Sequence, residues 1–255
     1  MSAQLFDLTG KTALITGSSR GLGLAIAEGL AGAGARIAIN GRDGAAVEKT
    51  AEALAGRGIK ALTAVFDVVD DAAARNAVTK LESEVGAIDI LVNNAGSNIR
   101  GPLHEYDAEN FRRMLDLHIT AAFVLAQAVV PGMRRRGGGK IVNIASITAM
   151  LVRSGIAAYA SAKAGLRTLT QSMGAEWAPF NIQANAIAPG YFATELNTPL
   201  MNDPQFDAFV KGRVPAGRWA EPKELAGVAV FLASRAADFV TGQTLYVDGG
   251  LTARM

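Results

Sequence analysis

The chain has 255 residues, half of them apolar, no cysteine, and a formal net charge of +2. The absence of cysteine excludes disulfides, thiolate chemistry and cysteine-based metal sites, and is compatible with a reducing compartment. Basic residues are scattered apart from the run 134–136, so the sequence has no basic stripe for nucleic acid. Its first residues show no charged region followed by an apolar run, and its longest apolar stretch, 119–133, is interrupted by Thr, Gln, Pro and Gly. We therefore expect a cytoplasmic protein that binds neither nucleic acid nor a membrane and holds no metal.

Short apolar runs rich in β-branched residues alternate with helical patterns along the chain. They predict seven strands, at 12–15, 36–40, 64–66, 88–92, 140–144, 182–187 and 244–247. Helices are predicted at 24–28, 43–55, 70–85, 158–177 and 222–232, and the three glycines at 137–139 predict a helix end after 134–136. This alternation predicts an α/β fold, a Rossmann-type doubly wound sheet of seven parallel strands with helices on both faces. With no linker or repeat in sight, residues 1–255 are expected to form a single domain.

The first predicted strand runs into a glycine-rich loop and then directly into a helix. The loop comprises Gly17, Ser19, Arg20, Gly21, Leu22 and Gly23. A dinucleotide pyrophosphate needs close backbone N–H donors and a helix N-terminus that faces it, and glycine removes the Cβ that would obstruct the approach. We predict that this loop binds a dinucleotide cofactor. The alternative is a tight turn between strand and helix with no ligand.

The end of the second predicted strand bears on which nicotinamide cofactor is bound. An acid at this point would bind the ribose 2′-hydroxyl, but the sequence reads Asn40, Gly41, Arg42, Asp43. Arg42 and Arg20 could both approach a 2′-phosphate with charge-assisted hydrogen bonds. We predict that NADP(H) is preferred and NAD(H) possible, with Asn40 and Arg42 among the cofactor contacts. The alternative is that Arg42 is solvated and Asp43 caps the following helix.

Three residues in the second half of the chain could perform acid–base chemistry. Tyr159 and Lys163 are four apart at the start of a predicted helix, so they share one face and the ammonium lies near the phenol. A nearby cation lowers the pKa of a tyrosine, which makes the phenol a usable proton donor and acceptor. Ser146 follows the fifth predicted strand, at the edge of the sheet where ligands of such folds bind, and its hydroxyl could hold a reacting oxygen.

Taken together, these motifs resemble the short-chain dehydrogenase/reductase family over nearly the whole chain. They are the glycine loop, the Asn-Asn-Ala-Gly turn at 93–96, Ser146, Tyr159 with Lys163, Pro189-Gly190 and the Asp-Gly-Gly at 248–250. The resemblance implies that Tyr159 is the catalytic acid/base, that Lys163 lowers its pKa and binds the nicotinamide ribose, and that Ser146 orients the substrate carbonyl. The hydride itself belongs to the cofactor.

The resemblance also implies further cofactor contacts and an assembly. The implied contacts are Asp67 and Val68 by the adenine, Asn94, Ala95 and Gly96 along the cofactor, and Pro189, Gly190 and Thr194 around the nicotinamide carboxamide. Many members are homotetramers built on two long helices, which correspond to 116–133 and 158–177 here. The first of these is apolar nearly all round, which suits burial against a partner subunit.

One residue departs from the family pattern. Members commonly have an asparagine in the helix before the fifth strand, where it holds a water that relays protons to the lysine, but this chain has His118 there. We predict that His118 bonds the relay water, because an imidazole can donate and accept at neutral pH. The alternative is a packed or interface histidine with an impaired relay. His104, beside Glu105, is expected to lie on the surface.

Within the family, the stretches 187–195 and 218–222 and Arg100 are similar to gluconate 5-dehydrogenases. A sugar acid carries a carboxylate, and Arg100 or Arg153 could bind it because both follow strand ends on the ligand side of the sheet. The expected function is hydride transfer between NADP(H) and a secondary alcohol or ketone of a sugar acid such as gluconate. A 3-oxoacyl-thioester reductase is the enzymatic alternative, and a non-catalytic dinucleotide-binding sensor or structural subunit is the alternative of another class.

Overall fold

Seven parallel strands form one sheet, in the order β3-β2-β1-β4-β5-β6-β7, in the computed structural model, which describes residues 2–254. The strands are β1 (Thr12–Ile15), β2 (Arg36–Gly41), β3 (Ala61–Val65), β4 (Ile90–Asn93), β5 (Gly139–Ile144), β6 (Ile182–Pro189) and β7 (Thr244–Val247). The predicted fold class is confirmed. The main error in the strands is β3, expected at 64–66: it pairs only with β2 and is half-buried, so its sequence has no continuous apolar run to mark its start.

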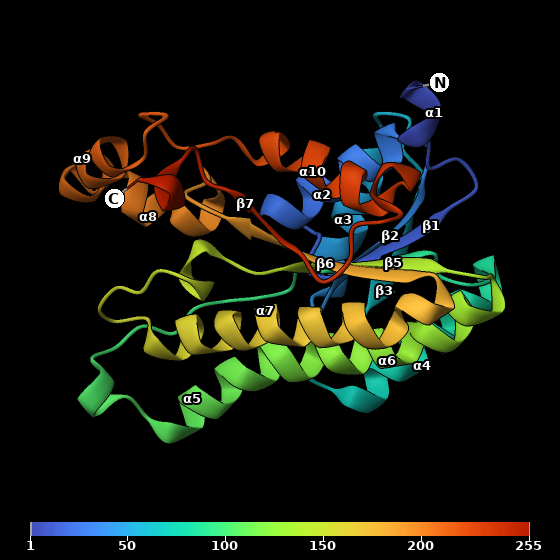
Figure 1. The fold of residues 1–255 in the computed structure, drawn as a ribbon, viewed down its shortest axis with the longest axis horizontal. Coiled ribbons are helices and arrows are strands. Elements are labelled where there is room, and N and C mark those ends of the chain that lie inside the picture. Colours follow the sequence, from blue (N-terminus) through green and yellow to red (C-terminus); the bar gives the residue numbers. More distant parts are fainter. Residues whose placement is uncertain (1, 255) are drawn as a thin grey trace.

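Helices cover both faces of the sheet (Figure 1). They are α1 (Ser2–Leu5), α2 (Gly21–Gly32), α3 (Gly44–Ala55), α4 (Asp71–Val85), α5 (Ala108–Leu115), α6 (Ala121–Arg135), α7 (Ala157–Trp177), α8 (Thr198–Met201), α9 (Pro204–Arg213) and α10 (Ala226–Ala233). One apolar core lies under α2, α3 and α10, and a second lies under α4, α6 and α7. The sheet therefore has a dry layer on each side, and its carboxyl edge is the part left for a ligand.

The helix expected at 116–133 is longer and less regular than predicted. It begins with α5 at Ala108, where the Asp107 carboxylate accepts a hydrogen bond from the Glu109 N–H, and it passes through a π-helical turn at Asp116–Thr120 before α6. The whole run, Ala108–Arg135, is long and apolar enough to cross a membrane by length and composition alone. Here it packs along α4 and α7 over one face of the sheet, as core helices of globular proteins do (Figure 1).

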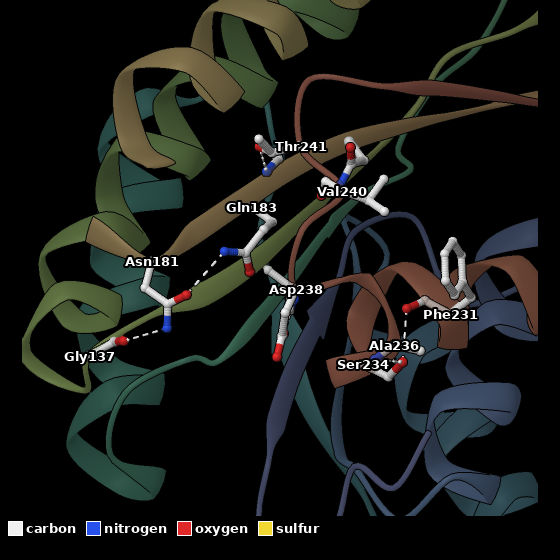
Figure 2. A network of polar contacts seen from close by, with 12 residues as sticks. Gly137, Asn181, Gln183, Phe231, Ser234, Ala236, Asp238, Val240 and Thr241 are labelled. Carbon is white, nitrogen blue, oxygen red and sulfur yellow. Dashed lines mark hydrogen bonds and ion pairs between the residues drawn. The ribbon is translucent and has the colours of Figure 1, made fainter. Parts of the chain in front are cut away.

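At the amino edge of the sheet, polar side chains tie the loops to the strands (Figure 2). The Asn181 amide donates to the Gly137 carbonyl at 2.9 Å and accepts from Gln183 at 3.2 Å, which fixes the glycine turn after α6. Nearby, the Asn185 amide donates to the Val240 carbonyl at 2.7 Å. Buried polar groups are costly unless they are paired, so these contacts close the edge opposite the predicted site.

Candidate active site

The glycine loop leaves the N-terminus of α2 open to a ligand. Arg20 occupies the position before the helix, and within residues 2–254 no side chain caps the helix there, whereas aspartates cap α3, α4, α5 and α9. Gly21 has a φ of +60° and open space where a Cβ would stand. The free N–H groups of the first turn and the bare loop surface fit a dinucleotide pyrophosphate.

Two asparagines hold this loop against the sheet. The Asn40 side chain accepts from the Gly17 N–H at 3.1 Å and donates to the carbonyls of Ala64 and Phe66. The Asn94 amide donates to the carbonyls of Thr16 and Gly17 at 2.9 and 3.0 Å. Asn40 is fully buried and all its side-chain atoms are bonded within the protein, so it positions the loop instead of facing a ligand, which corrects its predicted role.

The two arginines predicted to contact a 2′-phosphate, Arg42 at the end of β2 and Arg20 in the glycine loop, lie on the surface. Arg42 is exposed and forms no ion pair with any described residue, while Asp43 caps α3 through the Ala46 N–H at 3.2 Å. Arg20 is 77% exposed and lies 3.9 Å from the Glu195 carboxylate. The capping role considered for Asp43 is therefore observed, and its carboxylate is directed to the first turn of α3.

The remaining cofactor residues implied by the family follow the same edge of the sheet. Val68 is buried beyond β3, next to the half-buried Asp67, whose carboxylate accepts from the Val69 N–H at 3.2 Å. Pro189 ends β6, and a Cβ on Gly190 would stand 2.8 Å from the Asp248 Cα, so only glycine fits there. The other members of the set are Ser19, Leu22 and Gly23 in the loop, Ala95 and Gly96 after β4, and Thr194 after β6.

Ser146, Tyr159 and Lys163 converge where β5 meets α7. Ser146 follows β5 and accepts from the Thr148 N–H at 3.1 Å, which fixes its hydroxyl at the start of a short 3₁₀ turn. Tyr159 stands in the first turn of α7, and Lys163 lies one turn later. The Lys163 ammonium donates to the Ile144 carbonyl at 2.5 Å and lies 5.6 Å from the centre of the Tyr159 ring. The predicted juxtaposition of these three side chains is therefore present.

Burial sets the proton affinity of this group. It raises the pKa of Tyr159, and a hydrogen bond with the Ser146 hydroxyl lowers that pKa in part. It also lowers the pKa of Lys163 to about 7, so the lysine is only partly protonated at neutral pH. The sequence led us to expect that a charged Lys163 lowers the pKa of Tyr159; in the protein alone burial raises this pKa, and the group that lowers it is Ser146.

His118 lies behind this group, in the π-helical turn. Its ring meets the Tyr159 ring edge to face, with centroids 5.2 Å apart, and its Nε2 lies 2.8 Å from the Ser97 carbonyl. Burial, and then the positive charge of Lys163, lower the pKa of His118 to about 3. With this pKa, His118 is not an imidazolium at neutral pH. A neutral ring that donates from Nε2 keeps only Nδ1 as an acceptor. In the predicted relay, His118 can therefore only accept a hydrogen bond from the water, at Nδ1.

Arg100 and Arg153 approach the same tyrosine from different loops. Burial raises the pKa of Tyr191, whereas the positive charges of Arg153 and then Arg100 lower it. The two loops are joined by a hydrogen bond of 3.1 Å from the Gly101 N–H to the Gly155 carbonyl. Neither arginine pairs with a carboxylate in the part of the chain that the structure describes. His104, as expected, is on the surface beside Glu105.

An aromatic cluster beside these arginines was not singled out from the sequence. Tyr191 packs on Phe206 and Trp219 with ring centroids 5.9 and 5.4 Å apart, and the Arg153 guanidinium lies 5.1 Å from the centre of the Phe206 ring. The Trp219 indole donates to Asp207 at 2.9 Å. Only 6% of the chain is aromatic, so five aromatic residues from 191 to 219 were the signal available. The cluster is a rigid apolar surface against which the Arg153 guanidinium packs.

Comparison with known proteins gives consistent results over nearly the whole chain. The model of a family described as "Enoyl-(Acyl carrier protein) reductase" matches residues 17–252. The chain is 45% identical over 251 residues to the gluconate 5-dehydrogenase of Gluconobacter oxydans, covering 98% of both chains. It is 46% identical over 257 residues to the 2-dehydro-3-deoxy-D-gluconate 5-dehydrogenase of Formosa agariphila, covering 99% of this chain and 97% of the relative. The structure of a gluconate 5-dehydrogenase from Burkholderia cenocepacia in complex with NADP and tartrate is similar with a TM-score of 0.96, 48% identity and full coverage of both chains.

Proposed function

The chain belongs to the short-chain dehydrogenase/reductase family, and we propose that it is an NADP(H)-dependent oxidoreductase that interconverts a secondary alcohol of a sugar acid and the corresponding ketone. One observation carries the proposal: Ser146, Tyr159 and Lys163 meet at the carboxyl edge of the sheet, and the loops that follow β4 and β5 at the same edge carry two arginines that have no acidic partner among the described residues. The first group supplies acid–base chemistry, and the second supplies a place for an anionic substrate.

The glycine loop and the residues at the end of β2 fit NADP(H) as the cofactor. The uncapped N-terminus of α2 offers donors to a pyrophosphate, and the exposed Arg42 offers a cation to a 2′-phosphate. The similar gluconate 5-dehydrogenase from Burkholderia cenocepacia was solved with NADP, which supports the same preference. When bound, the nicotinamide supplies the hydride chemistry, and the protein orients the reacting carbon against it.

The side chains of Tyr159, Ser146 and Lys163 carry out the proton transfer. In the oxidation direction, Tyr159 takes the proton of the substrate hydroxyl, and Ser146 holds the same oxygen in place by a hydrogen bond. Because burial raises the pKa of Tyr159, the phenolate is scarce at neutral pH. A protonated Lys163, 5.6 Å from the ring centre, stabilises it. Because Lys163, with a pKa of about 7, loses its charge as the pH rises while the Tyr159 phenolate forms, we infer that the two groups together set the pH dependence of oxidation.

The substrate class follows from the charge beside the reacting group. Arg100 and Arg153 both act on Tyr191, and a carboxylate placed between them can accept charge-assisted hydrogen bonds from either guanidinium. The relatives from Gluconobacter oxydans and Formosa agariphila are named as dehydrogenases of sugar acids, so the carboxylate of such an acid is the group we assign to this position. Relatives named as dehydrogenases also argue against a non-catalytic role.

The test is a paired assay that follows the absorbance of the reduced cofactor. Purified protein is given NADP+ with gluconate, and separately NADPH with an acetoacetyl thioester, because the matching family model carries the name of a thioester-linked reductase. We expect turnover with gluconate and little with the thioester. Turnover with the thioester alone would replace the sugar-acid proposal with the thioester reductase. No turnover with either, despite tight NADP+ binding, would support a sensor or structural role.

We also propose that four copies assemble along α5–α6 and α7. Phe123 on α6 is 42% exposed although the rest of that helix buries a long apolar face, and Phe180 just after α7 is 36% exposed. A partner subunit would cover these rings and remove their contact with water. Light scattering on a size-exclusion column tests this against a chain mass of 26.5 kDa. A monomer mass would refute it.

A further inference from the structure

His118 touches both halves of the proposed active site. On one side its Nε2 lies 2.8 Å from the carbonyl of Ser97, in the segment that leads from β4 to Arg100. On the other side its ring packs against Tyr159, with centroids 5.2 Å apart. We propose that His118 and Gly96 are a matched pair that positions the segment 96–101, and with it Arg100, relative to Tyr159. The proposal rests on the proposed function only for the role of Arg100.

The tautomer of His118 follows from its contacts. The Ser97 carbonyl can only accept, so the imidazole must donate from Nε2. Nδ1 is then an acceptor, and it is buried without a partner among the described residues. It borders a cavity large enough for about one water molecule, which is also lined by Lys163 and by Asn93, whose Oδ1 is likewise buried and unpartnered there. One water donating to both acceptors would hold the ring in this tautomer.

A glycine is needed at position 96 because the imidazole of His118 leaves no room for a Cβ, and not because of the backbone conformation. A Cβ at this position would stand 2.6 Å from the His118 Cε1, closer than real Cβ atoms approach, and 3.2 Å from its Nδ1, which is also a tight contact. The φ of Gly96 is outside the left-handed region, so any residue could adopt its backbone. A side chain here would therefore push the segment and the ring apart, and the two positions depend on each other.

The segment is held at two more points, which provides a matched control. The Tyr106 hydroxyl donates to the Ile99 carbonyl at 2.9 Å, and the Gly101 N–H donates to the Gly155 carbonyl at 3.1 Å. Tyr106 touches the segment and is not among the residues that line the small cavity beside Lys163. Tyr106→Phe therefore removes one anchor of Arg100 and leaves the contact between His118 and Tyr159 intact.

The first experiment is a double-mutant cycle with gluconate and NADP+. We expect Gly96→Ala to raise the KM for gluconate about tenfold and to lower kcat about tenfold, since a displacement of about 1 Å can cost up to a hundredfold. In the background of His118→Ala, the same substitution should cost less than about twofold in either constant. Tyr106→Phe should raise the KM and leave kcat unchanged. An equal loss from Gly96→Ala in both backgrounds, or no loss in the wild type, would overturn the proposal.

The second experiment needs no substrate and remains decisive if gluconate is the wrong acid or Gly96→Ala does not fold. The chain has only two histidines, so the ring nitrogens of His118 and His104 can be resolved by nitrogen-15 NMR. We expect His118 to be the Nε2–H tautomer and not to titrate between pH 5 and 8. A His118 that carries its proton on Nδ1, or titrates in this range, would refute the pairing with Ser97 whatever the substrate is.

Discussion

The two edges of the sheet differ in how their buried polar groups are paired, although Glu82 Oε1 at the amino edge is also buried without a partner among the described residues. At the amino edge, the buried Asp89 accepts from the Thr12 N–H at 3.0 Å and from Lys11 at 3.2 Å, and Lys140 donates to Asp238 at 2.7 Å. Figure 2 shows Asn181 nearby, joined to the Gly137 carbonyl and to the Gln183 amide. At the carboxyl edge, the buried polar atoms Asn93 Oδ1, Asn98 Oδ1, His118 Nδ1 and Thr148 Oγ1 have no protein partner in the described chain.

This difference separates stability from function within one fold. A paired polar group at the amino edge contributes about 1 kcal/mol or more to folding, and it leaves nothing for a ligand to bind. An unpaired buried group costs a comparable amount and persists where water, substrate or cofactor completes it. Substitutions at the carboxyl edge should therefore reduce activity more than stability, and those at the amino edge should do the reverse.

The largest effect is expected from Tyr159→Phe. Removing the phenolic hydroxyl deletes the proton acceptor, and general acid–base catalysis of this kind contributes about a hundredfold to ten-thousandfold. We expect kcat for gluconate oxidation to fall about a thousandfold. The Kd for NADP+ should stay within about twofold of the wild-type value, and the midpoint of urea unfolding within about 0.3 M. A Tyr159→Phe enzyme that kept a tenth of the wild-type kcat would show that another group moves the proton.

The sequence predicted the site correctly where a residue's place on a strand or helix determines where its side chain lies. Ser146, Tyr159 and Lys163 each have a fixed place on the strand or helix that carries them, so their spacing predicted their meeting. The prediction failed for Asn40, because position in a strand does not tell whether an amide turns towards a ligand or towards neighbouring backbone. The π-helical turn around His118 and the approach of Arg100 and Arg153 to Tyr191 depend on tertiary packing, which leaves no local signal.

His118 predicts a dependence of stability on acid. Its pKa is about 3 in the folded protein, against an ordinary 6.5, so only the unfolded chain takes up a proton between these values. Stability is therefore lost as the pH falls through 6.5 towards 3. Between pH 7.5 and 4.5 the wild type should lose about 2 kcal/mol more unfolding free energy than His118→Asn. Urea unfolding at the two pH values measures this, and parallel losses in the two proteins would mean that His118 is hydrated.

Asp89→Asn tests the amino edge. The carboxylate is 4% exposed and also lies 3.5 Å from Arg136, but both of its cationic partners are about half exposed, so solvent screens much of the attraction. We expect a loss of about 2 kcal/mol in unfolding free energy, with kcat and both KM values unchanged. Thermal unfolding and the gluconate assay on the same sample check it. A drop in kcat without a drop in stability would reverse the contrast between the two edges.

Arg153→Ala tests the carboxylate position with less structural disturbance. Arg153 is exposed and rests on Phe206, so its loss removes a charge and a stacking contact without opening the core. The KM for gluconate should rise about tenfold at low salt and the wild-type KM should itself rise with ionic strength, because a partly exposed ion pair is screened. Arg153→Lys, which keeps the charge without the planar fork, should recover only part of the loss. A neutral polyol oxidised equally well by wild type and Arg153→Ala is the control.

Arg42→Ala should have the smallest effect and should act on the cofactor alone. Arg42 is exposed, it has no ion pair with a described residue, and the neighbouring Asp43 is engaged in capping α3. Loss of one solvent-exposed contact to a 2′-phosphate should raise the KM for NADP+ about fivefold and leave the KM for NAD+ unchanged, since NAD+ lacks that phosphate. Arg20→Ala is the matched comparison, because Arg20 already lies 3.9 Å from Glu195 and has less to offer a second anion. Equal losses for the two cofactors would place the 2′-phosphate elsewhere and leave the preference for NADP(H) without its residue.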